Sequence, residues 1–109
     1  MSTQPDGFKA LYPFESHFLD LRGIRYHYLD EGDGEIIVMV HGNPTWSFYY
    51  RHLIADLRAK YRVIAPDHVG CGLSDKPQQY DYTLTRHIAN LEALMEHLAL
   101  KKITLVLHD

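Results

Sequence analysis

The chain has 109 residues, of which 46% are hydrophobic and 23% are charged, a composition typical of an ordinary globular domain. Its formal net charge of −3 gives no reason to expect nucleic acid as a partner. The N-terminus shows no basic segment followed by an apolar stretch, and no apolar run is long enough to cross a bilayer, so we expect a cytoplasmic protein without a membrane segment.

No positive sign of a metal or cofactor site is present in the sequence. The single cysteine, Cys71, excludes an internal disulfide and cannot form a thiolate metal site alone. The eight histidines are scattered and form neither an HExxH motif nor a tight cluster with Asp or Glu. Gly70 and Gly72 lack the third glycine and the acidic residue of a nucleotide-binding fingerprint. We therefore expect no metal and no cofactor.

The first expected elements are two strands, 17–21 and 24–29, in which apolar and polar residues alternate on either side of Arg22 and Gly23. This pattern predicts a β-hairpin with one face toward solvent. The next run, 36–40, is apolar throughout. Continuous apolarity is typical of a strand that is covered on both faces in a parallel sheet.

Helical spacing begins after this strand. One apolar stripe is expected to face the core, with Thr45 as the N-cap and Pro44 just before it. The stripe consists of Trp46, Tyr49, Tyr50, Leu53, Ile54 and Leu57. A strand at 61–65 follows, and Pro66 ends it.

A glycine-rich loop then leads into a second amphipathic helix, from about Thr83 to Leu98, and the run 103–107 predicts another buried strand. The apolar side of this helix comprises Leu84, Ile88, Leu91, Leu94, Met95 and Leu98. The order of elements starts antiparallel and becomes βαβ. It predicts an α/β fold in which an antiparallel hairpin leads into a mostly parallel sheet with helices on both faces.

Three segments carry a resemblance to a known family. They are VHGNPTWS at 40–47, APDHVGCGLSDKP at 65–77 and LVLHD at 105–109. In this order they resemble the α/β-hydrolase fold and, within it, the haloalkane dehalogenase family. The resemblance implies that residues 1–109 are the N-terminal part of one α/β-hydrolase core domain of about 250–300 residues, with the cap and the C-terminal half beyond residue 109.

In this resemblance Asp109 is the nucleophile, on the sharp strand-to-helix turn of the fold. A carboxylate with an unperturbed pKa of about 3.9 is already ionised near neutral pH, whereas a serine needs a base. It can displace a leaving group at sp³ carbon and form an alkyl-enzyme ester, which a histidine-activated water then hydrolyses. The resemblance places the acid and the base histidine later in the sequence, so we expect residues 1–109 alone to be inactive.

Two further site residues are expected. By resemblance, the backbone N–H of Asn43 belongs to the oxyanion hole, and its side-chain amide donates to a departing halide. The helical spacing of Trp46 is that of a core residue, and we also expect its side chain near the mouth of the substrate pocket. The implied activity is cleavage of carbon–halogen bonds in haloalkanes, with a small apolar organic molecule as substrate.

Other functions stay open at this stage. Epoxide hydrolases and the β-lactone decarboxylases of bacterial olefin synthesis share the aspartate nucleophile, but epoxide hydrolases typically carry an aromatic residue where Asn43 stands. A catalytically inert fragment or a binding module is the alternative from another class. The oligomeric state is not predicted.

A second constellation resembles a serine triad but is rejected. Ser74 follows a glycine loop without an elbow sequence, and the dipeptide of Asp67 and His68 is interpreted as turn chemistry. His41 lies inside the loop at the end of a strand, whereas the base histidine of the fold comes later. We therefore expect His41 to be a structural hydrogen-bonding residue.

Overall fold

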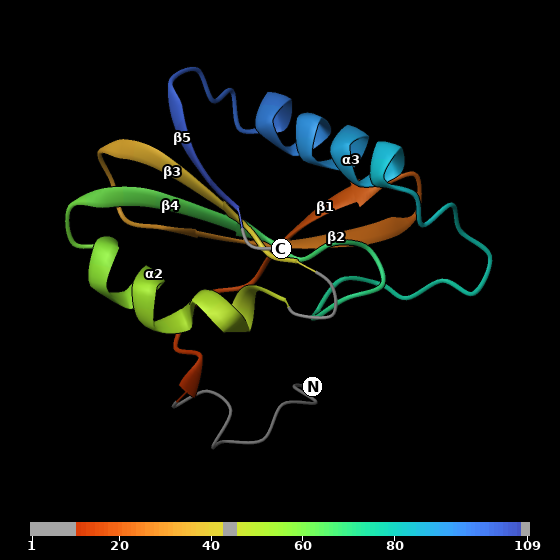
Figure 1. Ribbon diagram of the computed structural model, residues 1–109, viewed down its shortest axis with the longest axis horizontal. Helices are drawn as coiled ribbons and strands as arrows, with labels where there is room; N and C mark the ends of the chain where they lie inside the picture. The colour runs from red at the N-terminus through yellow and green to blue at the C-terminus, as the bar shows by residue number, and fades with distance from the viewer. Residues whose placement is uncertain (1–10, 43–45, 108–109) are drawn as a thin grey trace.

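The computed structural model describes residues 11–42 and 46–107 and arranges them around one five-stranded sheet (Figure 1). The strand order is β1-β2-β4-β3-β5, with β1 (His17–Leu21), β2 (Ile24–Glu31), β3 (Glu35–Val40), β4 (Tyr61–Pro66) and β5 (Ile103–Leu107). β1 with β2 and β2 with β4 pair antiparallel, whereas β3 pairs in parallel with both β4 and β5. The predicted hairpin leading into a parallel sheet is confirmed.

The β1–β2 hairpin turns on Arg22 and Gly23, whose φ angles are 55° and 91°. Positive φ at both central residues is the type I′ geometry, which matches the twist of the flanking strands. The expected solvent face is wrong for β2, because residues 26–29 are all buried. Both faces of β2 are covered, because Leu29 packs in one hydrophobic cluster and Tyr26 and Tyr28 pack in another on the opposite side of the sheet.

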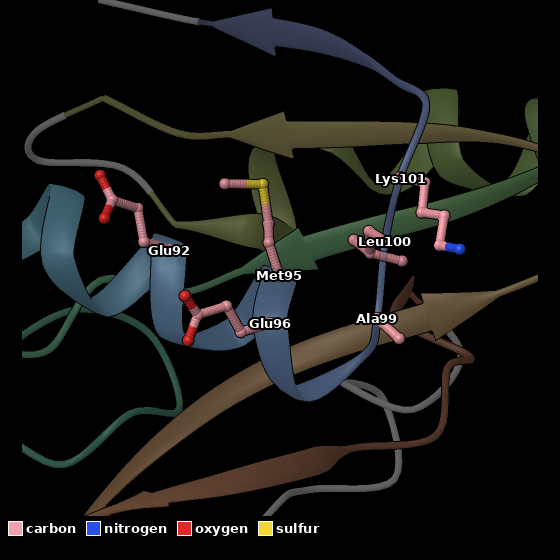
Figure 2. A pocket seen from close by; sticks show the side chains of 6 residues that line it. All are labelled: Glu92, Met95, Glu96, Ala99, Leu100 and Lys101. Atoms are coloured by element: carbon pink, nitrogen blue, oxygen red, sulfur yellow. The ribbon is translucent and has the colours of Figure 1, made fainter.

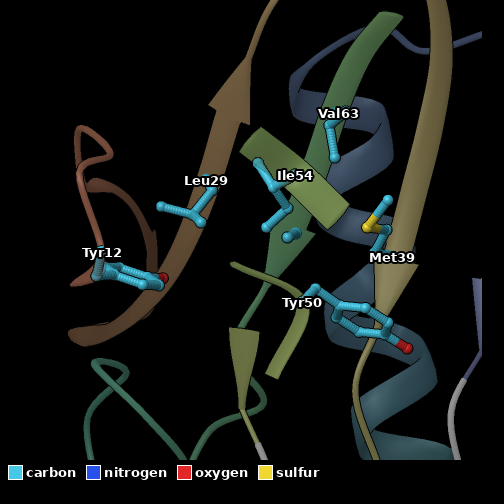
Figure 3. Packing of buried hydrophobic residues seen from close by; sticks show 7 residues of the cluster. Tyr12, Leu29, Met39, Tyr50, Ile54 and Val63 are labelled. Atoms are coloured by element: carbon cyan, nitrogen blue, oxygen red, sulfur yellow. The ribbon is translucent and has the colours of Figure 1, made fainter. Parts of the chain in front are cut away.

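Helical segments cover both faces of the sheet, as predicted (Figure 1). A 3-10 turn, η1 (Ser47–Tyr50), and the helix α2 (Arg51–Leu57) lie on one face, and α3 (Leu84–His97) lies on the other. The cluster beneath α2 contains Tyr12, Leu29, Met39, Tyr50, Ile54, Val63 and Ala65 (Figure 3). The cluster beneath α3 contains Tyr26, Tyr28, Val38, Val40, Ile64, Val69 and Leu94. Neighbouring residues of one strand fall into different clusters because their side chains point to opposite faces.

The first helical segment is shorter and less buried than its spacing predicts. Tyr50 and Ile54 are buried, but Tyr49 and Leu53 are 51% and 43% exposed. A 3-10 turn followed by seven helical residues presents only a narrow row of side chains to the sheet. The predicted cap, Thr45, lies outside the described residues.

The second helix has the predicted bounds but a different buried face. Its N-cap is Thr83, whose hydroxyl accepts from the N–H of Arg86 at 3.2 Å. Leu94 is fully buried, whereas Ile88 and Leu84 are 47% and 75% exposed, so the predicted apolar side is wrong at these two positions. At about 100° per residue, Ile88 lies roughly a third of a turn away from Leu94. The helix therefore contacts the sheet through the face centred on Leu94.

β5 is an edge strand within the described part of the chain, and its side chains are only partly buried, with Thr104, Leu105 and Leu107 exposed. Leu105 and Leu107 are 47% and 69% exposed. Both side chains point to the α3 face. Ile103 packs on that face, and residues two and four positions further along a strand point to the same side. Figure 1 shows that α3 does not extend over this end of the strand.

An open pocket of about 310 Å³ lies at the C-terminal end of α3 (Figure 2). Its lining residues are Glu92, Met95, Glu96, Ala99, Leu100 and Lys101. Glu92, Met95 and Glu96 lie on the last turns of α3, and the other three residues belong to the connection between α3 and the amino end of β5. None of the helices in the described ranges has both the length and the apolar character needed to cross a bilayer.

Candidate active site

The carboxyl ends of β3, β4 and β5 lie at one edge of the sheet. Val40 pairs with Leu107 at the ends of β3 and β5, and Val38 pairs with Ile64 of β4. In open α/β sheets, ligands bind beside the carboxyl ends of the strands. Asn43 follows Val40 by three residues and Asp109 follows Leu107 by two. Both predicted site residues lie outside the described residues, so their roles remain predictions.

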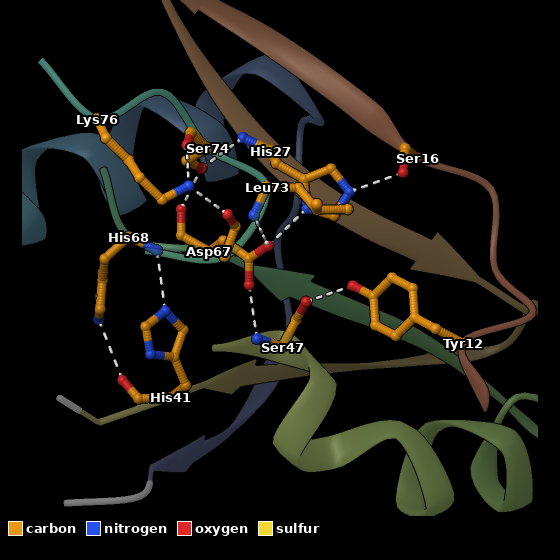
Figure 4. Close-up of polar contacts among 11 residues, drawn as sticks. Tyr12, Ser16, His27, His41, Ser47, Asp67, His68, Leu73, Ser74 and Lys76 are labelled. Atoms are coloured by element: carbon orange, nitrogen blue, oxygen red, sulfur yellow. Dashed lines mark hydrogen bonds and ion pairs between the residues drawn. The ribbon is translucent and has the colours of Figure 1, made fainter. Parts of the chain in front are cut away.

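Among the described residues at this edge, the side chain of Asp67 accepts three hydrogen bonds; Asp67 directly follows β4 and is completely buried. One carboxylate oxygen, Oδ2, accepts from Nδ1 of His27 at 2.8 Å and from the backbone N–H of Leu73 at 3.1 Å. The other, Oδ1, accepts from the backbone N–H of Ser47 at 2.6 Å (Figure 4). Asp67 thus joins β2, the glycine loop and the start of η1.

The environment of Asp67 favours the ionised carboxylate. Burial alone raises the pKa of a carboxyl group, but the bonds from His27, Ser47 and Leu73 outweigh it and hold the pKa of Asp67 below its usual value. All three partners donate, so the ionised form satisfies every one of them.

The contacts of Asp67 continue into the segment before β1. Nε2 of His27 lies 3.0 Å from the hydroxyl of Ser16, and the hydroxyls of Tyr12 and Ser47 are hydrogen-bonded to each other. Burial, with a smaller effect from the nearby Asp67 charge, raises the pKa of Tyr12. We call this set the Asp67 network: Tyr12, Ser16, His27, Ser47, Asp67 and Ser74.

Ser74 belongs to the same network but is not arranged as a nucleophile. Its hydroxyl donates to the backbone carbonyl of Asp67 at 2.6 Å and accepts from the backbone N–H of His27 at 2.8 Å. The side chain is buried, and both partners are main-chain atoms. These contacts agree with the rejection of the serine triad.

His41 is a structural hydrogen-bonding residue, as predicted. Its Nδ1–H donates to the carbonyl of Gly42 at 2.9 Å, and its Nε2 accepts from the backbone N–H of His68 at 2.9 Å. In return, Nε2–H of His68 donates to the carbonyl of His41 at 3.1 Å (Figure 4). Only the neutral ring of His41 can donate at one nitrogen and accept at the other.

His68 is the middle ring of a histidine row, His41–His68–His87, drawn from three separate parts of the chain. Ring centroids lie 4.4 Å apart between His41 and His68, and 4.5 Å apart between His68 and His87. Burial and the two neighbouring histidines lower the pKa of His68 to about 4, and burial lowers the pKa of His41 and His87 as well. The row is therefore neutral at physiological pH.

The histidine row does not form a metal centre. Within the described ranges, no three His, Cys, Asp or Glu side chains are grouped so that they could hold a metal ion. Buried Nδ1 atoms of His68 and His87 lack a hydrogen-bond partner among these residues. The row has no local signal in the sequence, because His41 follows β3, His68 lies shortly after β4 and His87 lies on α3, and the three rings meet only in the folded chain.

Trp46 packs among aromatic side chains beside the Asp67 network. Its ring stacks on Phe48 at 5.3 Å and lies 5.4 Å from Tyr12. Gly72 leaves room for it, since a Cβ at that position would lie 2.7 Å from the indole and 2.5 Å from Oδ2 of Asp67. This packing fits the core spacing of Trp46, and its predicted contact with substrate remains a prediction.

Comparisons with known proteins match this architecture. The sequence profile of the α/β hydrolase fold matches residues 35–109. The chain is 57% identical, over 92% of its own length and 32% of the relative, to a cis-3-alkyl-4-alkyloxetan-2-one decarboxylase of Shewanella oneidensis. It is 46% identical, over 84% of its length and 32% of the relative, to haloalkane dehalogenase 2 of Mycobacterium tuberculosis.

Solved structures give the same result. A haloalkane dehalogenase of Agrobacterium tumefaciens superimposes with a TM-score of 0.79 at 36% identity, over 87% of this chain and 32% of that one. An epoxide hydrolase of Vigna radiata does so with a TM-score of 0.81 at 30% identity, over 91% of this chain and 33% of that one. The chain thus spans about a third of the length of these relatives. The predicted resemblance is confirmed, and the chain belongs to the α/β hydrolase fold family.

Proposed function

We propose that the whole protein carrying this chain uses the carboxylate of Asp109 as a nucleophile toward sp³ carbon, and that its substrate is a dialkyl β-lactone. The observation that carries the choice of substrate is the 57% identity to a relative named for oxetan-2-one decarboxylation. The pairing of Val40 with Leu107 supports the site, because it brings the strand ends before Asn43 and Asp109 together.

The proposed reaction has two steps and consumes no water. A carboxylate oxygen of Asp109 first attacks the ring carbon that bears the ring oxygen, so that an ester bond forms, the ring C–O bond breaks and a substrate carboxylate is released. The bond from that carboxylate to the adjacent carbon then breaks as carbon dioxide. Its electron pair forms the C=C bond, and the ester bond returns its pair to Asp109. Inversion followed by anti elimination converts a cis lactone into a cis alkene.

The second candidate is the haloalkane dehalogenase activity expected from the sequence motifs. It is supported by the 46% identity to a mycobacterial dehalogenase and by Asn43 as a halide donor. Here the same attack expels a halide, and a water must then hydrolyse the ester. The two reactions therefore differ in whether solvent oxygen enters the enzyme.

The test compares a β-lactone, a bromoalkane and an epoxide as substrates of the whole protein in ¹⁸O-labelled water. We expect alkene and carbon dioxide from the lactone, no label in Asp109, and complete loss of turnover in Asp109→Ala. Turnover of the bromoalkane with label in Asp109 would establish the dehalogenase instead. In that case Asn43→Ala is expected to lower kcat by about 10²–10³-fold. No reaction with any substrate would favour the non-catalytic alternative.

A further inference from the structure

We propose that Asp67 and His68, two consecutive residues after β4, are positioning residues that fix the chain on both sides of Asn43. The inference rests on the proposed function, because it gives Asn43 its role beside Asp109. Neither residue is proposed to touch substrate. Their task is to hold the ends of the segment from His41 to Ser47 in register with the sheet edge.

His68 holds the amino end of this segment. Its backbone N–H donates to Nε2 of His41 at 2.9 Å, and its own Nε2–H donates to the carbonyl of His41 at 3.1 Å. Two bonds between the same two residues fix both the ring and the main chain of His41. Rotation of the His41 ring would also break its hydrogen bond to the carbonyl of Gly42.

Asp67 holds the carboxyl end. Its Oδ1 accepts from the backbone N–H of Ser47 at 2.6 Å, where η1 begins and where Trp46 provides no side-chain cap. A carboxylate at the start of a helical turn satisfies an N–H that the turn leaves without an internal partner. The contact is completely shielded from solvent, since Ser47 and Asp67 are both fully buried.

The position of Asp67 is set by β2 rather than by the segment it holds. Its backbone N–H donates to the carbonyl of His27 at 2.9 Å, and its Oδ2 accepts from Nδ1 of the same histidine. β2 is an inner strand of the sheet. Hydrogen bonds therefore connect β2 to Asp67 and Asp67 to Ser47. A displacement of the carboxylate would shift Ser47, which is the carboxyl end of the segment.

The first test variant is Asp67→Asn in the whole protein. An amide has one acceptor oxygen, so when that oxygen faces His27 and Leu73, its NH₂ group opposes the N–H of Ser47. We expect hydrogen exchange to accelerate in peptides covering residues 42–50 and to stay unchanged in β2 and β4. Because a displacement of about 1 Å at a site can cost roughly 100-fold in rate, we expect kcat to fall about 10- to 100-fold with little change in KM.

The matched control is Tyr80→Phe. It removes the bond in which the buried Asn90 donates to the hydroxyl of Tyr80 at 2.8 Å, and neither residue belongs to the Asp67 network. We expect it to lower the unfolding midpoint while leaving kcat and the exchange of residues 42–50 as in the wild type. A second variant, His68→Phe, keeps the ring of the histidine row and removes its Nε2–H donor. It is expected to accelerate hydrogen exchange in the peptides covering residues 42–50. If Asp67→Asn does not fold, this variant tests whether the segment is held in position.

The outcomes separate this inference from the proposed function. Faster hydrogen exchange confined to residues 42–50, together with a fall in kcat in Asp67→Asn, supports the positioning role. Exchange that rises evenly across the sheet, an unchanged kcat, or an equal kcat loss in Tyr80→Phe overturns it. A wild-type protein that turns over none of the three substrates overturns the proposed function, and the exchange experiment still decides whether Asp67 and His68 hold the segment.

Discussion

At the scale of single residues, the loop after β4 needs glycine at position 72 because Asp67 and Trp46 pack against it. Gly72 has a φ of 54°, and the space beside it is filled by Asp67 and Trp46. Gly23, by contrast, has a φ of 91°, and a Cβ at that position would meet nothing within 4 Å. Substitution of Gly23 therefore tests the cost of a positive φ alone, whereas substitution of Gly72 adds the cost of crowding against Asp67 and Trp46.

We expect Gly72→Ala to be much more destabilising than Gly23→Ala. A positive φ costs a non-glycine residue about 1–2 kcal/mol, and overpacking adds about 1–3 kcal/mol at Gly72 alone. Denaturant unfolding of the whole protein measures both free energies. Equal losses in the two variants would show that the loop relaxes away from Asp67 and Trp46.

The histidine row makes stability depend on pH. The pKa of His68 falls from an ordinary 6.5 to about 4 in the folded chain, so the unfolded chain binds a proton at a higher pH than the folded chain does. The stability that depends on a neutral His68 is therefore fully present above pH 6.5 and is lost as the pH falls toward 4. Asp67 contributes to a separate loss at lower pH, since its pKa lies below the ordinary 3.8.

His68→Phe is expected to weaken this pH dependence. Its ring cannot take up a proton, so the drop in unfolding free energy between pH 7 and about pH 4.5 should be smaller than in the wild type. Denaturant unfolding at the two pH values gives the comparison. The same drop in both proteins would show that other groups control acid unfolding in this range.

At the scale of elements, α3 shows how a sequence can predict a helix and mispredict its orientation. Thr83 and the apolar spacing predict its bounds, because a cap and a periodicity are local signals. Which flank meets the sheet depends on neighbours elsewhere in the chain. Asn90 is buried and donates to the hydroxyl of Tyr80 at 2.8 Å, whereas Leu84 is exposed.

Truncation of two leucines tests this orientation. Leu94→Ala removes a fully buried side chain and is expected to cost about 2–5 kcal/mol of unfolding free energy. Leu84→Ala removes a side chain that is 75% exposed and should change stability by no more than about 0.5 kcal/mol. Similar losses at both positions would restore the buried face that the sequence spacing predicted.

The candidate site was predictable only in part, for a related reason. The order of apolar runs and the three motifs identify the sheet edge and the fold family from local patterns. The Asp67 network is not visible in the same way, because His27 and Asp67 are 40 residues apart and meet only when β2 and β4 pair. A turn residue was therefore expected where the structure has a buried carboxylate that connects three segments.

At the scale of the whole molecule, the exposed edge of β5 is expected to control the behaviour of residues 1–109 expressed alone. Leu105 and Leu107 are 47% and 69% exposed, and one row of strand N–H and C=O groups is unpaired by the described strands. Such an edge is a template for pairing with another chain. We expect residues 1–109 alone to self-associate or to remain partly unfolded.

Replacement of one leucine tests the role of this edge. Leu107→Lys should raise the monomeric fraction in sedimentation experiments, because an edge lysine opposes strand pairing. Leu84→Lys changes an even more exposed leucine away from the strand and should have no such effect. A wild-type monomer with a sharp cooperative unfolding transition would contradict the prediction.

The bonds of Tyr12 and Ser16 set a practical limit on how this protein can be cut or fused. Tyr12 is only 3% exposed and is bonded to Ser47, while Ser16 is bonded to His27. These residues precede the first strand, where sequence-based domain boundaries are usually drawn. A truncation that starts at His17 would leave the hydroxyl of Ser47 and the ring of His27 without these partners. Gene fusions and domain exchanges in this protein should therefore place their junction before Tyr12.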